Sequence, residues 1–169
     1  MDKPLVNRVA NSGIITINLE DYFPEIEVVD FDLKGYLFQE MILKEKDFRA
    51  ALKEHDWQQY SGKTITVYCS VDAIIPTWAY MLVSSYCGHL ASDVFQGTKE
   101  EYYTYYYKKL LSEMDYSQYQ DKLLVIKGCN KLPVPTLAYM ELTNKLKPFA
   151  KSIMYGEPCS TVPIYKRPK

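Results

Sequence analysis

Three of the four cysteines in this chain follow segments that resemble β-strands. Cys69 ends one apolar, β-branched run, Cys129 follows a second, and Cys159 follows a third. Thiolate sulfur is a soft ligand that suits zinc or iron, and three cysteines with one further ligand form an ordinary metal site. The carboxyl ends of parallel strands in one sheet share an edge. The pattern therefore predicts a transition-metal site, zinc or iron, at that edge.

A fourth ligand for such a site has three candidates in the sequence, and water is a further possibility. Asp72 and Glu157 lie close in sequence to Cys69 and Cys159, respectively. His89 is the weakest candidate, because it falls at the far end of the helix expected after Cys69. Carboxylate oxygen and imidazole nitrogen both bind zinc, so the residue types alone leave the choice open.

Separate roles for the cysteines are the alternative to a shared site. The chain has no CxxC pair, and the long intervals between the three cysteines match no short metal motif. Cysteine also serves commonly as a small buried hydrophobe, and Cys87, which lies within a predicted helix, is expected in the core. Cys69 aligns with Gly128 in the repeat described below. Cys69 and Cys129 are therefore offset by one residue in the alignment. Such an offset would point their side chains to opposite faces of the sheet.

Two predicted helix starts offer a second kind of site. Pro76 precedes Thr77 and Pro135 precedes Thr136, so each helix would present free N–H groups and a hydroxyl. The segment after the last predicted strand adds the hydroxyls of two further residues, Ser160 and Thr161. A small anion, either free or part of a metabolite, would fit such a site. Against it, these loops contain neither a glycine-rich phosphate loop nor an arginine, and Pro-Thr pairs also simply begin helices.

The sequence shows no conventional catalytic constellation. Cys129 is placed like a nucleophile, after a strand and before a helix. A base is missing, because His55 precedes a strand and His89 ends a helix, so neither is expected at the same sheet edge. Whether the protein is an enzyme stays open.

An internal repeat organises the segments that position these residues. Residues 56–97 match residues 115–156 at 11 of 42 positions without a gap, an offset of 59 residues. Ordinary residue frequencies would give about two or three matches. The repeat copies extend over approximately residues 36–94 and 95–153.

Strand and helix patterns alternate along both copies, which predicts an α/β fold. Predicted strands are 14–19, 27–33, 36–38, 64–69, 91–95, 123–127 and 152–156, and predicted helices are 45–57, 76–89, a helix opening at residue 98, and 135–149. Short links between alternating elements favour right-handed crossovers onto a parallel sheet. We therefore expect one α/β domain, residues 14–163, with about five mainly parallel strands. The first two strands form an appended antiparallel pair, residues 1–13 an arm, and residues 164–169 a basic tail.

A tyrosine-rich stretch falls in the helix that opens at residue 98. Tyr103, Tyr107, Leu110 and Met114 recur at helical spacing, which predicts core or half-buried packing for them. The remaining tyrosines would then lie partly outside, where they are compatible with a self-association surface for a homodimer: Tyr102, Tyr105 and Tyr106.

Composition excludes several classes of protein. The 169 residues carry a formal net charge of −1 and only three arginines, which argues against nucleic-acid binding. Neither a signal segment nor 18 consecutive apolar residues occur, so we expect a cytoplasmic protein with no membrane partner. In that compartment the cysteines should be reduced.

Five segments together carry a family resemblance: Ile42–Arg49, His55–Trp57, Pro76–Met81, Val125–Cys129 and Ser152–Pro163. On these segments the chain resembles a family of uncharacterised bacterial proteins, domain-of-unknown-function family 2480. The resemblance implies a bacterial origin and a full-length single domain. It implies no activity, so the chemical argument depends on the residues themselves.

Overall fold

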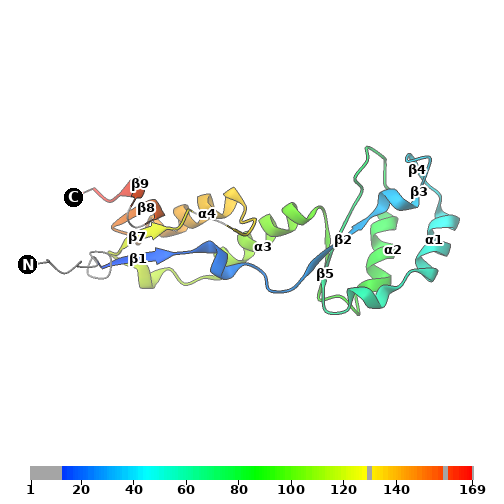
Figure 1. Ribbon diagram of the computed structural model, residues 1–169, viewed down its shortest axis with the longest axis horizontal. Helices are drawn as coiled ribbons and strands as arrows, with labels where there is room; N and C mark the ends of the chain where they lie inside the picture. Colours follow the sequence, from blue (N-terminus) through cyan, green and yellow to red (C-terminus); the bar gives the residue numbers. More distant parts are fainter. Residues whose placement is uncertain (1–12, 129–130, 158–159, 169) are drawn as a thin grey trace, which may run out of the picture. The chain divides into compact units, whose positions relative to one another are not determined.

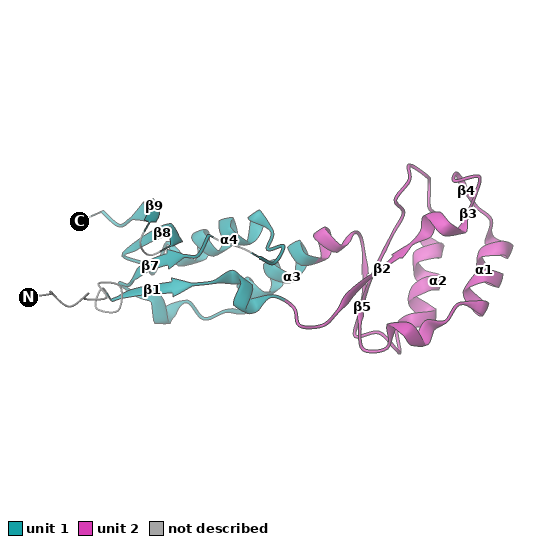
Figure 2. Ribbon diagram, viewed as in Figure 1, with its two compact units in different colours: residues 1–23, 103–169 teal, residues 24–102 magenta. Residues whose placement is uncertain are grey.

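The structure, a computed structural model, describes residues 13–128, 131–157 and 160–168 (Figure 1). The chain divides into two compact units (Figure 2). Unit 2 is the continuous segment 24–102, whereas unit 1 combines residues 1–23 with residues 103–169. The polypeptide thus begins unit 1, completes unit 2 and then returns to unit 1. Among the described helices, none has both the length and the apolar character that a membrane span requires.

Unit 2 is built on three parallel strands in the order β2-β5-β6. Its elements are β2 (Val28–Asp32), β3 (Leu37–Phe38), β4 (Ile42–Leu43), α1 (Glu45–Glu54), β5 (Thr64–Tyr68), α2 (Thr77–Cys87), β6 (Asp93–Gln96) and the first turn of α3 (Lys99–Glu113). The short strands β3 and β4 form an antiparallel hairpin. Because α1 and α2 connect successive parallel strands in one direction, right-handed crossovers place both helices on the same face of the sheet.

The core of unit 2 lies between that face and the helices. Ile65 and Val67 of β5 pack against residues of α1 and α2, and both are nearly fully buried. The residues that alternate with them point to the opposite face, as the period of a strand requires. On that face the hydroxyl of Thr66 donates a 2.7 Å hydrogen bond to Oδ1 of Asp30, so this buried polar group is satisfied.

Unit 1 has a sheet of four strands in the order β1-β7-β8-β9. Its elements are β1 (Ile14–Ile17), the rest of α3, β7 (Leu123–Ile126), α4 (Thr136–Leu146), β8 (Ser152–Glu157) and β9 (Ser160–Lys166). Strands β1, β7 and β8 run parallel, and β9 returns antiparallel to β8. The first three strands and their helices therefore follow the same element order as unit 2.

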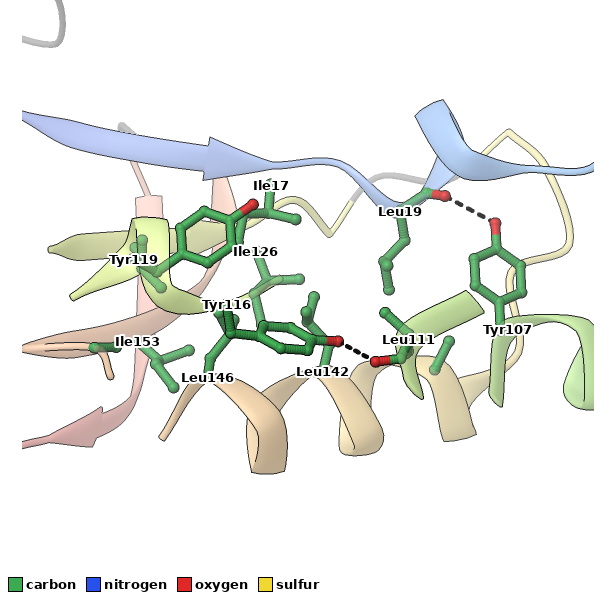
Figure 3. Close-up of a cluster of buried hydrophobic side chains, with 13 residues drawn as sticks. Ile17, Leu19, Tyr107, Leu111, Tyr116, Tyr119, Ile126, Leu142, Leu146 and Ile153 are labelled. Carbon is green, nitrogen blue, oxygen red and sulfur yellow. Dashed lines mark hydrogen bonds between the residues drawn. The ribbon is translucent and has the colours of Figure 1, made fainter. Parts of the chain in front are cut away.

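Two tyrosine hydroxyls are buried in the core of unit 1, and each has a backbone acceptor (Figure 3). Tyr107 donates to the carbonyl oxygen of Leu19 at 2.8 Å, and Tyr116 donates to that of Leu111 at 2.6 Å. Burial raises the pKa of both phenols, that of Tyr116 to about 12. Tyr107 thereby connects α3 to the segment that follows β1, although 88 residues separate the two.

Buried side chains in the two units occur at the 59-residue spacing. The pairs are Phe48 with Tyr107, Leu52 with Leu111, Ile65 with Leu124, Val67 with Ile126, Ala79 with Ala138, Val83 with Leu142 and Cys87 with Leu146. Each pair occupies the corresponding helix or strand in its own unit. Matching positions therefore face the two cores.

The mixed α/β class and the parallel strands are confirmed, but two details of the predicted sheet are wrong. The strands form two mainly parallel sheets and a hairpin instead of one sheet. The first two strands do not pair with each other, because β1 pairs with β7 and β2 pairs with β5. Ile17 packs in the core of unit 1 and Phe31 in that of unit 2, so each strand joins the sheet of its own unit.

The predicted basic tail, residues 164–169, overlaps a strand that the sequence did not reveal. Strand β9 continues to Lys166, and five of its seven side chains are exposed. A mostly exposed strand shows little apolar alternation, which removes the usual sequence signal. Pro163 is tolerated there because β9 is an edge strand, and a register irregularity lies beside it.

Replacing Leu142 with alanine tests the core of unit 1. Its side chain is fully buried, so we expect the free energy of unfolding to fall by about 2 to 5 kcal/mol. Met140, on the same helix and 64% exposed, is the matched control, and Met140→Ala should cost no more than about 0.5 kcal/mol. Urea unfolding followed by circular dichroism measures both variants. Equal losses would contradict the described packing.

Candidate functional site

The carboxyl ends of β7 and β8 lie side by side in unit 1. Ile126 at the end of β7 is in register with Tyr155 of β8. The hydroxyl of Tyr155 reaches past the end of β7 and donates to the carbonyl oxygen of Gly128 at 3.2 Å. A Cβ at Gly128 would lie 2.8 Å from this ring, so a larger residue here would displace the end of the Tyr155 side chain.

A carboxylate holds the loop that enters α4 at this same edge. Oε1 of Glu20, in the turn after β1, accepts hydrogen bonds from the backbone N–H groups of Lys131 and Leu132, the latter at 2.6 Å. Bonds between backbone N–H groups and an ionised carboxylate are stronger than neutral ones. The loop between β7 and α4 is therefore tied to the chain that follows β1.

Cys129 and Cys159 lie outside the described residues. Their described neighbours, however, are part of this edge. Gly128 precedes Cys129, and Glu157 and Ser160 flank the pair of residues that contains Cys159. Glu157 and Ser160 are in register with each other at the tip of the β8–β9 hairpin.

In unit 2, Cys69 directly follows β5 and is partly exposed as a free thiol. The neighbouring loop is held by Asp32, which accepts hydrogen bonds from the backbone N–H of Ser70 at 3.0 Å and of Lys34 at 2.9 Å. Partial burial opposes ionisation of Asp32, but the hydrogen bonds from Ser70 and Lys34 outweigh it and lower the pKa of Asp32. Asp72 lies further along this loop and is exposed.

The three cysteines do not follow strands of a single sheet, so that expectation is wrong. Cys69 follows a strand of unit 2, whereas the strands before Cys129 and Cys159 belong to unit 1. His89 is exposed and follows α2, where the next residue pairs with the chain before β5, so it lies at the opposite edge from Cys69. Within the described part of the chain, no group of three or more histidine, cysteine or acidic residues could hold a metal.

Cys87 is in the core of unit 2, as expected. It is fully buried, and its thiol donates to the carbonyl oxygen of Val83 at 3.2 Å. Burial raises the pKa of the thiol, which leaves it protonated and unreactive near neutral pH.

The residues predicted to bind an anion fall in both units. Thr77 and Thr136 are the first residues of α2 and α4, and both are exposed. Ser160 and Thr161 are part of β9, where Thr161 is in register with Gly156. The hydroxyl of Thr161 points to the sulfur of Met154 at 3.6 Å. Only Thr136 and the β9 pair therefore share a unit.

Each unit has a shallow groove between its second crossover helix and the strand that follows it. The groove of unit 1 has a volume of about 340 Å³, and that of unit 2 about 530 Å³. Their linings correspond at the 59-residue spacing: Val67 with Ile126, Tyr80 with Tyr139, Met81 with Met140, Ser84 with Thr143, Ser85 with Asn144 and Gln96 with Tyr155. Two additional residues, Thr136 and Ile164 of β9, line only the groove of unit 1.

One tyrosine of α3 is more buried than the sequence predicted. Tyr107 is fully buried, as expected, but Tyr102 is only 7% exposed and packs edge-on against Phe95. Tyr106 is partly buried and donates to the carbonyl oxygen of Tyr22. Tyr105 is 49% exposed. Placing Tyr102 on an exposed self-association surface was therefore wrong.

Sequence reasoning overlooked a histidine between two tyrosines in unit 2. The hydroxyl of Tyr36 lies 3.3 Å from Nδ1 of His55, and the hydroxyl of Tyr60 lies 3.1 Å from Nε2. Partial burial lowers the pKa of His55, although the nearby Asp56 opposes the shift, and burial raises the pKa of Tyr60 to about 12. A neutral imidazole, with one donor and one acceptor, suits two hydroxyl partners. The repeat could have indicated that His55 is partly buried, because it aligns with Met114, which is itself partly buried.

The pH dependence of stability tests this histidine. The folded protein holds the pKa of His55 below its ordinary value of 6.5, so the unfolded chain binds the proton more readily. The contribution of His55 to the free energy of unfolding should therefore decrease as the pH falls below about 6.5. Urea titrations between about pH 5 and 8 should show this component in the wild type but not in His55→Gln.

The matched control is His89→Gln, because the chain has only two histidines and His89 is exposed. This variant should keep the wild-type dependence between about pH 5 and 8. Identical pH profiles for the wild type and His55→Gln would show that His55 has no such shift.

Comparison with known proteins gives one result. A family model described as "Protein of unknown function (DUF2480)" matches residues 3–167. No curated protein and no solved structure matches the chain. The match agrees with the resemblance of the sequence segments.

Proposed function

The chain belongs to the DUF2480 family, whose function is unknown, and from that premise we propose that it binds a transition metal, zinc or iron, through Cys129 and Cys159 of unit 1. The observation that carries the proposal is the parallel pairing of β7 with β8. Cys129 comes three residues after Ile126, and Cys159 comes four residues after Tyr155, its partner in the register.

Chain length supports a shared ligand set. Cys129 directly follows Gly128 and Cys159 directly precedes Ser160 in the sequence, and both of these neighbours are described. Neighbouring strands lie about 4.8 Å apart. Two thiolates bound to one zinc have sulfur atoms about 4 Å apart, since each Zn–S bond is about 2.3 Å in a tetrahedral site. These dimensions are compatible.

Two cysteines alone leave a metal incompletely coordinated, so further ligands are needed. Glu157 ends β8 and supplies a carboxylate two residues before Cys159. Cys69 and Asp72 belong to unit 2, and the proposed ligand set does not include them. His89 also belongs to unit 2 and lies at the opposite edge of its sheet from Cys69. Water can complete the coordination in an open site.

Metal content of the purified protein tests the proposal. Protein prepared without chelators or metal-affinity resin should contain about one equivalent of zinc or iron by elemental analysis. Cys129→Ser and Cys159→Ser should each lose most of it, because serine is a poor ligand for these metals. Reconstitution with cobalt(II) should produce thiolate charge-transfer absorption that both variants lack.

Cys69→Ser is the matched control, and it should keep the metal. Loss of metal from this variant would instead add Cys69 to the ligand set. Less than about a tenth of an equivalent in the wild type, with no cobalt absorption, would end the proposal.

A second candidate is a non-catalytic module that binds a small anion. It is favoured by Thr136, which is exposed at the first residue of α4 and lines the groove of unit 1. Thr77 has the corresponding position at the start of α2. The two candidates use different atoms and do not exclude each other.

Thermal shift measurements test the anion candidate. Phosphate, sulfate and carboxylate metabolites are added at increasing concentration, and a true ligand at 100 times its dissociation constant should stabilise the fold by about 2.7 kcal/mol. Thr136→Val should remove the shift, because it replaces the hydroxyl and keeps the side-chain shape. An equal shift in wild type and variant would exclude Thr136 as a ligand.

A further inference from the structure

The sheet of unit 1 has a second face, turned away from the helices that cover its core. Leu124 and Ile126 of β7 and Ile153 of β8 pack in the core against α3 and α4. Because side chains alternate along a strand, Leu123 and Met154 point to the other face. Both are only partly buried.

A groove of about 830 Å³ lies on this other face. Its lining includes the apolar residues Leu123, Met154 and Pro163 and the basic residues Lys151, Lys166 and Arg167. Its volume is within the range of about 300 to 1,000 Å³ that is typical of small-molecule sites, which are mostly apolar with a few charged groups.

The charges in the groove are unbalanced. Asp121 is the one acidic residue among its described lining, and it is paired with Arg167. Nη2 of Arg167 also donates to the carbonyl oxygen of Phe149 at 2.6 Å, which fixes the guanidinium in place. The positive charges of Lys151 and Lys166 are therefore left in excess, although the whole chain has a net charge of −1.

We propose that this groove binds a small anionic amphiphile. An apolar chain or ring would lie along Leu123, Met154 and Pro163, with a carboxylate or phosphate near Lys151 and Lys166. We infer an anionic ligand from the charge imbalance, because excess positive charge favours an acidic ligand over a neutral or basic one.

This site is separate from the proposed metal site. Leu123 begins β7 and Ser152, which also lines the groove, begins β8, whereas the two cysteines follow the other ends of these strands. A failure of metal binding would therefore leave this inference standing, and the reverse also holds.

Decanoate below its micelle concentration is the probe, and methyl NMR of protein labelled at methionine is the measurement. The Met154 signal, assigned with Met154→Leu, should shift with saturation as decanoate is added. Decyltrimethylammonium, which has the same chain and the opposite charge, should cause no saturable shift. Added salt should weaken decanoate binding, because it screens the lysine charges.

Charge reversal tests the two lysines. Lys151→Glu and Lys166→Glu should each weaken decanoate binding by about tenfold. The matched control is Lys145→Glu, on the exposed side of α4 and outside the groove, which should bind as the wild type does. Circular dichroism confirms that each variant is folded. The salt dependence of the wild type supplies the same information without a substitution.

Three outcomes would overturn the proposal. The first is an equal shift with both amphiphiles, which would show apolar binding without charge selection. The second is an equal loss in Lys145→Glu, which would show non-specific attraction. The third is binding of an acidic peptide or of phosphatidylglycerol vesicles without any binding of monomeric decanoate, which would assign the face to a macromolecular partner.

Discussion

Both units depend on one constraint, the handedness of the connection between parallel strands. In unit 2 the chain passes from β2 to β5 to β6 in one direction across the sheet, and in unit 1 it passes from β1 to β7 to β8. Right-handed crossovers then place both helices of a unit on the same face. One face of each sheet becomes a core, and the other face has no crossover helix over it. The Thr66–Asp30 hydrogen bond in unit 2 and the basic groove in unit 1 both lie on the face opposite the crossover helices.

Local patterns predicted most of the helices and strands. The β-branched run that forms β5 and the apolar stripe of α1 are local signals, and the structure has both elements close to the expected bounds. The partners of the strands were not predictable in this way. Ile14 is in register with Leu123, and no pattern within a short window encodes a pairing across 109 residues. Strand β9 was not predicted, because an exposed edge strand has little apolar alternation.

The candidate sites show the same difference between what local sequence predicts and what distant contacts determine. The strands that precede Cys69, Cys129 and Cys159 were predicted correctly, because a strand depends on local sequence. Which sheet each strand joins depends on distant pairing, so the sequence could not show that the strand before Cys69 belongs to a different sheet from the strands before the other two. His55 escaped notice for a similar reason. One of its hydroxyl partners, Tyr36, lies 19 residues earlier in the chain, and sequence spacing gives no warning of such a contact.

The nested path of the chain has a consequence for synthesis. Strand β1 leaves the ribosome first, but its partner β7 follows only after the whole of unit 2 has emerged. Unit 2 is continuous and can fold as soon as residue 102 is available, since domains generally fold as units. Until β7 is synthesised, β1 has no strand partner in its sheet. An unpaired strand edge is prone to aggregation. Closure of unit 1, with its long loop, is then the natural late step in folding.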